Sequence, residues 1–215
     1  PDRVLPAFRE ALEGHSLGEL EMHPQVVYGL DEDLTLAYMN PAWSCFAEAN
    51  GASSDFGCRW SLGAAVLDAI GGPSRRLIEG GFRNCLGHGQ SWVHEYECSS
   101  VTTFRRFRMS VSHLAPRRCL LVVHRLLVSG PHGPTGNLPH PPIDNRYREG
   151  SGMIIQCAHC RRFRRAGEQP IWDWVPAWVD SRPENTSGSF CESCFRRHFP
   201  QATLPEGSIH NEERL

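Results

Sequence analysis

The sequence predicts an α+β protein: a five-stranded antiparallel sheet with flanking helices, followed by a small module held by four cysteines. Three observations predict it. β-rich runs bracket a helical stretch in the first part of the chain, a segment rich in proline and glycine covers 129–152, and two C-x-x-C pairs follow. With 215 residues, of which 40% are hydrophobic, the chain is long enough for one or two units with their own cores.

The chain begins with an amphipathic stretch. Val4, Leu5, Phe8 and Leu12 recur at helical spacing. This pattern predicts a helical extension over 1–22 that either covers a sheet or pairs two chains.

A hairpin and a helix come next. The runs QVVYGLD (25–31) and LTLAYMN (34–40) are rich in strand-forming residues and are separated by two acidic residues, which predicts a β-hairpin. Asn40 and Pro41 supply a cap and a first-turn residue for the helical run PAWSCFAEAN, and Gly51 ends it.

In the rest of the first unit, two predicted helices are followed by three predicted strands. SLGAAVLDAIGG (61–72) and PSRRLIEGGFRNCLGHG (73–89) have helical patterns. Three strands are then predicted in succession, over 91–99, 103–114 and 117–128.

Residues 23–128 resemble the PAS sensor fold. The opening VVYGLDEDLTLAYMNPAW is similar to a hairpin that ends in an Asn before the first helix, and WVHEYEC, FRRFRMSVSHL and CLLVVH are similar to the closing meander. The resemblance implies a domain that senses a small ligand or cofactor, or mediates dimerisation. Many PAS domains end in Asp-Ile-Thr before a signalling helix, whereas this chain has Leu126, Leu127 and Val128 followed by a proline-rich linker at 129–152.

Side-chain alternation in the closing strands predicts which residues face the domain interior. The candidates for a ligand pocket are His94, Tyr96, Phe107, Met109, His113 and His124. Three histidines on one face fit a haem or metal pocket, because neutral imidazole is a common ligand of such ions. The alternative is a set of hydrogen-bonded or rim histidines, and both interpretations stay open.

The strongest motif is a pair of C-x-x-C units. Cys157, Cys160, Cys191 and Cys194 have the pattern of a closed four-sulfur zinc site, and we expect a zinc-ribbon-like module over 153–200 with a flexible tail at 201–215. The intervening WDWVPAWV is expected to form an element whose tryptophans supply the core. An iron–sulfur cluster and a thioredoxin-like redox pair are the alternatives. The other five cysteines stand singly and are expected to be small core residues.

The module also resembles a short cysteine-paired module found after PAS domains in some bacterial signalling proteins. MIIQCAHCRRFR and GSFCESCFRRHFP carry the likeness. In that module a His often precedes the second pair, whereas this chain has Gly188 and Ser189 there. No histidine ligand is therefore assigned, and His159 and His198 are weaker candidates.

Each cysteine pair leads into arginines, which are candidates for contact with a partner. They are Arg161, Arg162, Arg164, Arg165, Arg196 and Arg197. A patch of this kind can bind phosphate or an acidic partner. Residues 151–215 nevertheless contain eight Arg and eight Asp or Glu, which favours a protein partner over nucleic acid.

These observations predict a non-enzymatic bacterial signalling protein: a PAS sensor or adaptor coupled to a structural zinc module that contacts a partner. The chain contains no lysine and no phosphate loop or nucleophile motif, and a homodimer is expected. No apolar run is long enough for a membrane span, and the visible start has no secretory signal, so we expect a cytoplasmic protein. The alternatives are a haem-binding PAS sensor, a transcription regulator that binds DNA through the arginine-rich module, and a thiol redox protein.

Overall fold

The computed structural model describes residues 3–12, 14–132, 138–167 and 169–199. The chain divides into two compact units, and each is described by itself. The first comprises Pro1–Cys98 and Phe104–Gly130, and the second comprises Ser99–Thr103 and Pro131–Leu215. Within the described ranges, no helix combines the length and apolar character needed to cross a bilayer.

The first unit is built on a five-stranded sheet. Its strands are β1 (Val26–Leu30), β2 (Leu36–Met39), β3 (Trp92–Glu97), β4 (Thr103–Leu114) and β5 (Cys119–Pro131). Their spatial order is β2-β1-β5-β4-β3, and β1 is antiparallel to both β2 and β5. The first and last strands of this unit, β1 and β5, thus lie side by side in the middle of the sheet. This arrangement confirms the predicted α+β fold class, a five-stranded antiparallel sheet with flanking helices.

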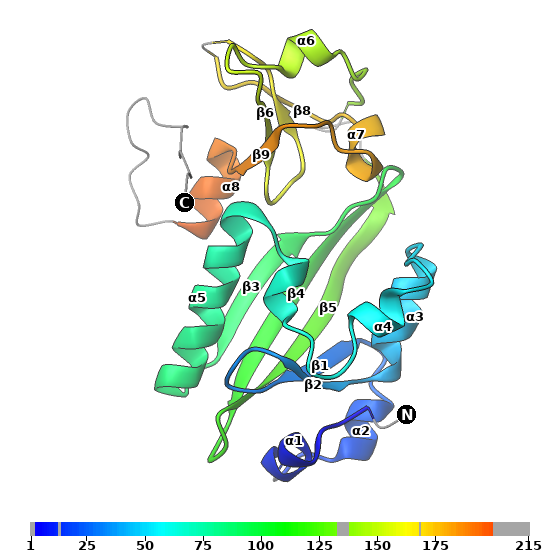
Figure 1. Ribbon diagram of the computed structural model, residues 1–215, viewed down its shortest axis with the longest axis vertical. Coiled ribbons are helices and arrows are strands. Elements are labelled where there is room, and N and C mark those ends of the chain that lie inside the picture. The colour runs from blue at the N-terminus through cyan, green and yellow to red at the C-terminus, as the bar shows by residue number, and fades with distance from the viewer. Residues whose placement is uncertain (1–2, 13, 133–137, 168, 200–215) are drawn as a thin grey trace. The chain divides into compact units, whose positions relative to one another are not determined.

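Helical segments lie between β2 and β3 in the sequence and cover one face of this sheet (Figure 1). They are α3 (Pro41–Ala49), α4 (Phe56–Arg59), the 3-10 turn η1 (Val66–Ala69) and α5 (Gly72–His88). α5 turns Phe82 and Leu86 into a core that also contains Met109 and Val111 of β4. We call this side of the sheet the inner face.

The segment 61–72 differs from its predicted helix. Only the four residues of η1 are helical there, together with Gly72, which begins α5. The backbone before η1 instead bonds to the chain around β2: the Gly63 N–H donates to the Leu36 carbonyl at 2.7 Å, and the Leu36 N–H donates to the Ala64 carbonyl at 2.9 Å. These groups cannot also form helical hydrogen bonds, so the residues before η1 form turns and a single bridge instead of a helix.

Asn40 holds the entry to α3, as its N-cap position predicts. Its Oδ1 accepts hydrogen bonds from the N–H of Trp43 at 3.3 Å and of Val27 at 3.0 Å. Its Nδ2 donates to the carbonyls of Gln25 at 2.8 Å and His23 at 3.1 Å. One buried side chain therefore satisfies the backbone at a helix start and at a strand start together.

The N-terminal helices α1 (Pro6–Ala11) and α2 (Leu17–Glu21) belong to the second core cluster of this unit. Phe8 and Leu12 pack there against residues such as Val27 and Leu121. The amphipathic start thus covers the sheet of its own chain, which is one of the two roles that its pattern predicted.

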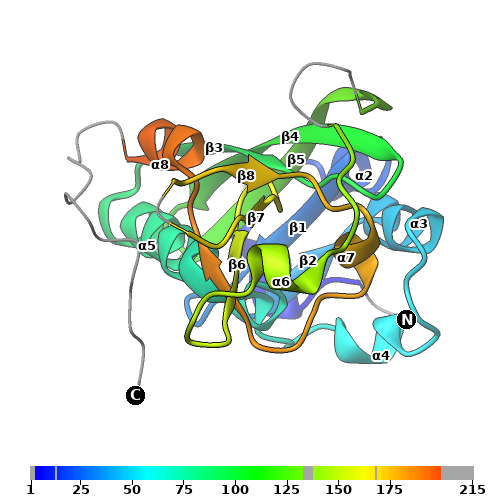
Figure 2. The same cartoon turned by 90° about the horizontal axis from the view of Figure 1, so that it is seen from above.

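The second unit contains a small four-stranded sheet. Its strands are β6 (Ile154–Cys157), β7 (Phe163–Arg164), β8 (Trp172–Asp173) and β9 (Thr186–Ser189), in the order β8-β7-β6-β9. The helices are α6 (Asp144–Tyr147), α7 (Ala177–Asp180) and α8 (Glu192–His198). Figure 2 labels β6, β7 and β8 together. β6 and β9 run parallel, while β6–β7 and β7–β8 are antiparallel.

The segment 129–152, expected to be a linker, contributes to this second unit. Tyr147 of α6 is fully buried with Ile154, Phe163 and Val175, and Trp178 packs against them. Tyr147 anchors the segment because its ring fills the core and its hydroxyl donates to Asp173 at 2.9 Å. Residues 133–137 and the expected tail at 201–215 lie outside the described residues.

Candidate functional site

Four cysteines meet at the ends of β6 and α8. Cys157 is the last residue of β6, and the tight turn after it places Cys160 on the same side, with the Arg161 N–H donating to the Cys157 carbonyl at 3.0 Å. Cys191 is the N-cap of α8, and Cys194 lies within that helix. The β6–β9 ladder pairs Cys157 with Ser189, which brings the second cysteine pair next to the first.

The geometry of the four sulfurs fits one ion. All four Sγ atoms lie within 4.8 Å of one another, and all four residues are buried. The Sγ atoms of Cys160 and Cys191 are 3.8 Å apart. Four sulfurs at Zn–S distances of about 2.3 Å in a tetrahedron are about 3.8 Å apart, so the spacing matches.

The same distances argue against the other readings of these cysteines. A disulfide needs its sulfurs about 2.05 Å apart, and all four cysteines are free. An iron–sulfur cluster spreads its thiolates over several irons, which a group this tight does not accommodate. The donor set therefore suits a single thiophilic cation with no open position.

Hydrogen bonds among the four thiols lower the pKa values of two of them and raise those of the other two. A hydrogen bond with Cys160 lowers the pKa of Cys157, and a hydrogen bond with Cys157 lowers the pKa of Cys191. The pKa values of Cys160 and Cys194 are raised, chiefly by their hydrogen bonds to Cys157. A cation that replaces the shared protons would bind all four as thiolates.

The two histidines that were weaker ligand candidates bind each other. Nε2 of His198 lies 2.8 Å from Nδ1 of His159. The metal-binding group within the described residues contains the four cysteines and neither histidine. Trp172 and Phe190 pack against the cysteines and help to exclude water from them.

Most of the arginines predicted to contact a partner are engaged within the module. Arg164 is buried and pairs with Glu149 at 2.9 Å, and Arg165 binds both carboxylate oxygens of Asp173 at 2.6 and 3.1 Å.

The remaining arginines differ among themselves. Arg196 pairs with Glu192 along α8, and Arg161 donates to the Ser99 carbonyl at 3.1 Å. Arg162 is partly buried, and Arg197 is exposed. The six side chains therefore do not form one free basic patch.

In the first unit, a histidine and two tyrosines form a hydrogen-bonded chain on the inner face. The Tyr96 hydroxyl lies 2.6 Å from Nδ1 of His124, and the Tyr28 hydroxyl lies 3.2 Å from Nε2. Burial lowers the pKa of His124 to about 4, and burial raises the pKa of both tyrosines. All three groups are thus held neutral. A neutral imidazole has one donor and one acceptor nitrogen, so it satisfies both hydroxyls at once.

The other pocket candidates also lie on this face, among packed rings. Phe107 and Met109 are buried. The His94 ring stacks between Trp92, at a centroid distance of 5.3 Å, and Tyr96, at 6.4 Å. Nε2 of His113 is buried without a hydrogen-bond partner among the described residues. The structure therefore places these candidates on one face, where His124 lies between two tyrosine hydroxyls and the His94 ring stacks in a row of aromatic rings.

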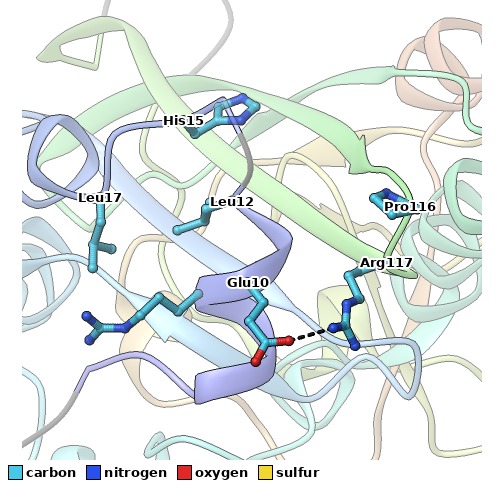
Figure 3. Close-up of a pocket in the computed structure, with 7 residues that line it drawn as sticks. Glu10, Leu12, His15, Leu17, Pro116 and Arg117 are labelled. Carbon is cyan, nitrogen blue, oxygen red and sulfur yellow. Dashed lines mark hydrogen bonds and ion pairs between the residues drawn. The ribbon is translucent and has the colours of Figure 1, made fainter.

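A surface pocket of about 480 Å³ lies elsewhere, beside the N-terminal helices. Figure 3 shows residues of α1, of the α1–α2 connection and of the β4–β5 turn around it. Glu10 and Arg117 form an ion pair, which Figure 3 draws as a dashed line. The lining residues are Arg9, Glu10, Leu12, His15, Leu17, Pro116 and Arg117.

Comparison with known proteins gives likeness at the level of fold. No family model matches the chain. No curated protein matches it either. Several solved PAS domains do. The PAS domain of nitrogen regulation protein NR(II) from Vibrio parahaemolyticus is 20% identical, with a TM-score of 0.33, and the match covers 52% of this chain and 99% of that one.

Two further solved structures are similar. The photoactive yellow protein domain of the sensor histidine kinase Ppr from Rhodospirillum centenum is 12% identical, with a TM-score of 0.36, covering 53% of this chain and 95% of that one. The PAS domain of Bordetella pertussis BvgS is 12% identical, with a TM-score of 0.34, covering 57% and 86%. These matches concern the fold and not the function.

Sequence reasoning missed three residues that matter in these sites. Tyr28 was not among the pocket candidates, because its place beside His124 depends on the pairing of β1 with β5. Tyr147 and Asp173, which anchor the second unit, were not singled out either. The acid flanked by tryptophans in WDW is a local signal that could have pointed to Asp173.

Proposed function

We propose that this protein is a non-enzymatic bacterial signalling component, in which a PAS-type sensor or adaptor domain is joined to a module held by structural zinc. The observation that carries the proposal is the buried group of four Sγ atoms within 4.8 Å of one another. Zinc suits it because four thiolates close its tetrahedral shell and leave no position for substrate. The module would then present a surface to a protein partner in the cytoplasm.

The metal assignment is tested by elemental analysis and a visible spectrum of the purified full chain. We expect one zinc per chain and no visible absorption. One iron per chain, with strong visible absorption bands, would assign iron instead of zinc to the same four thiolates. A matched pair of variants locates the site: Cys191→Ser should reduce the bound metal to a small fraction, while Cys45→Ser, which changes an exposed cysteine of α3, should leave it unchanged. Failure to copurify any metal would overturn the zinc module.

Haem is the second candidate for the first unit, on the strength of its inner-face histidines. His124 would have to give up a hydrogen bond to Tyr28 or Tyr96 in order to coordinate iron. We therefore favour a small neutral ligand, or an adaptor role without a ligand. A Soret band in protein reconstituted with hemin, lost in His124→Gln, would instead support haem.

DNA binding is tested separately. Two of the arginines beside the cysteines form ion pairs within the module, Arg164 with Glu149 and Arg165 with Asp173. Binding to a heparin column should therefore be weak, with elution at low salt. Retention to high salt that Arg197→Ala reduces would favour the transcription regulator. A thiol redox role would require disulfide-reductase turnover in zinc-free protein.

A further inference from the structure

A pair of histidines joins the two halves of the four-cysteine group. His159 stands between the two cysteines of the first pair and is 6% exposed. His198 is the last residue of α8, the helix that carries the second pair. Their facing nitrogens are 2.8 Å apart and their ring centroids 4.5 Å apart. One proton shared between the two nitrogens makes this a hydrogen bond between residues that are distant in sequence.

The position of this bond matters because α8 is short. It has seven residues, and a helix of that length is not stable by itself in water. Its first end is held by the Cys191 N–H, which donates to Sγ of Cys157 at 3.4 Å, and by the β9 strand before it. Its last end is held by His198, whose ring also contacts Phe190 at a centroid distance of 5.5 Å.

We propose that the His159–His198 hydrogen bond is a clasp that sets how fast the four-cysteine centre releases its metal. The inference rests on the proposed single-ion site. Cys194 lies on α8 between the two held ends, so freeing the last turn lets its thiolate leave the ion first. Groups outside the ligand shell that orient ligands typically change metal affinity by about 10-fold to 100-fold. The histidines act as positioning residues and not as ligands.

The test uses the full chain loaded with zinc, mixed with an excess of a coloured zinc chelator. His159→Ala and His198→Ala should each release zinc about tenfold faster than the unchanged protein, in line with that range. The double variant should release it no faster than either single variant, because the same bond is lost only once. Arg197→Ala is the matched control: its side chain is exposed on the same turn of α8, and its rate should not change.

Two further measurements separate a clasp from general damage. His198→Gln keeps a hydrogen-bonding group near the position of Nε2, so it should restore most of the slow rate. A Gln variant as fast as the Ala variant would overturn the clasp. The cobalt-substituted forms of the unchanged protein and of both Ala variants should have the same visible absorption spectrum, that of cobalt bound by four sulfurs. A spectrum that differs in an Ala variant would show that a histidine is a ligand and would overturn the proposal.

The outcomes also distinguish this inference from the proposed function. If the unchanged protein binds no stoichiometric metal, the zinc module itself is wrong. If it binds zinc and neither Ala variant releases it faster, the module stands and only the clasp is wrong.

Discussion

The Tyr96 hydroxyl lies 2.6 Å from Nδ1 of His124, and burial of this imidazole holds it neutral. Burial lowers the pKa of His124 to about 4, whereas an unfolded histidine titrates near about 6.5. Between these pH values the unfolded chain binds a proton that the folded chain does not. The free energy of unfolding should therefore fall as the pH drops from about 6.5 toward 4, by up to about 3 kcal/mol.

Urea unfolding at pH 7.5 and at pH 5 measures this difference. His124→Gln should lose the part of the pH dependence that comes from this residue. His15→Asn, which changes an exposed histidine in the α1–α2 connection, should keep it. An equal pH dependence in the His124→Gln protein and the unchanged protein would contradict the prediction.

The two tyrosines should contribute unequally. Tyr96→Phe removes the shorter hydrogen bond and leaves a partly buried nitrogen of His124 without its partner, which costs about 1–3 kcal/mol. Tyr28→Phe removes the contact at 3.2 Å and should cost less. Urea midpoints at pH 7.5 order the two variants, and the reverse order would show that the Tyr28 bond is the stronger.

Gly29 should not tolerate a side chain, because Phe8 of α1 lies directly on it. A Cβ added to Gly29 would overlap with Cζ of Phe8. Gly29→Ala should therefore push α1 off the sheet and lower the free energy of unfolding by about 1–3 kcal/mol. Limited proteolysis should cut the N-terminal segment faster in this variant.

Two further variants test whether contact with Phe8 is the cause of the lost stability. Gly57→Ala should be nearly neutral, since no atom lies within 4 Å of its added Cβ. Adding Phe8→Leu to Gly29→Ala should recover part of the lost stability. A Gly29→Ala protein as stable as the unchanged protein would mean that α1 does not pack on β1 as described.

Asp173 should be the most sensitive charged residue of the second unit. It is 5% exposed, binds Arg165 through both oxygens and accepts a hydrogen bond from Tyr147. Asp173→Asn leaves Arg165 without its counter-charge, which should destabilise the unit by about 3 kcal/mol. Tryptophan fluorescence during urea unfolding reports it, because Trp174 and Trp178 lie in this unit. Glu192→Gln, at the exposed pair with Arg196, should change stability by about 0.5 kcal/mol or less.

Local patterns predicted much of the fold. The hairpin, the Asn40 cap and the three closing strands all depend on residues near one another in the sequence, and the structure has each of them. Local propensity failed at 61–72, where hydrogen bonds to the chain around β2 override a helical pattern. It failed again at 129–152, since composition alone did not reveal that Tyr147 is buried.

By itself, the sequence determined the five strands of the first unit, the inner-face parity of the closing strands and the pairing of cysteines within each C-x-x-C turn. These features depend on steric preferences and spacings within a few residues. Only the tertiary structure decided which tyrosine meets His124, because Tyr28 lies 96 residues away and reaches it through the β1–β5 register. It also decided that Arg164 pairs with Glu149 and Arg165 with Asp173, because a charge removed from water is stable only beside a counter-charge that the fold brings to it.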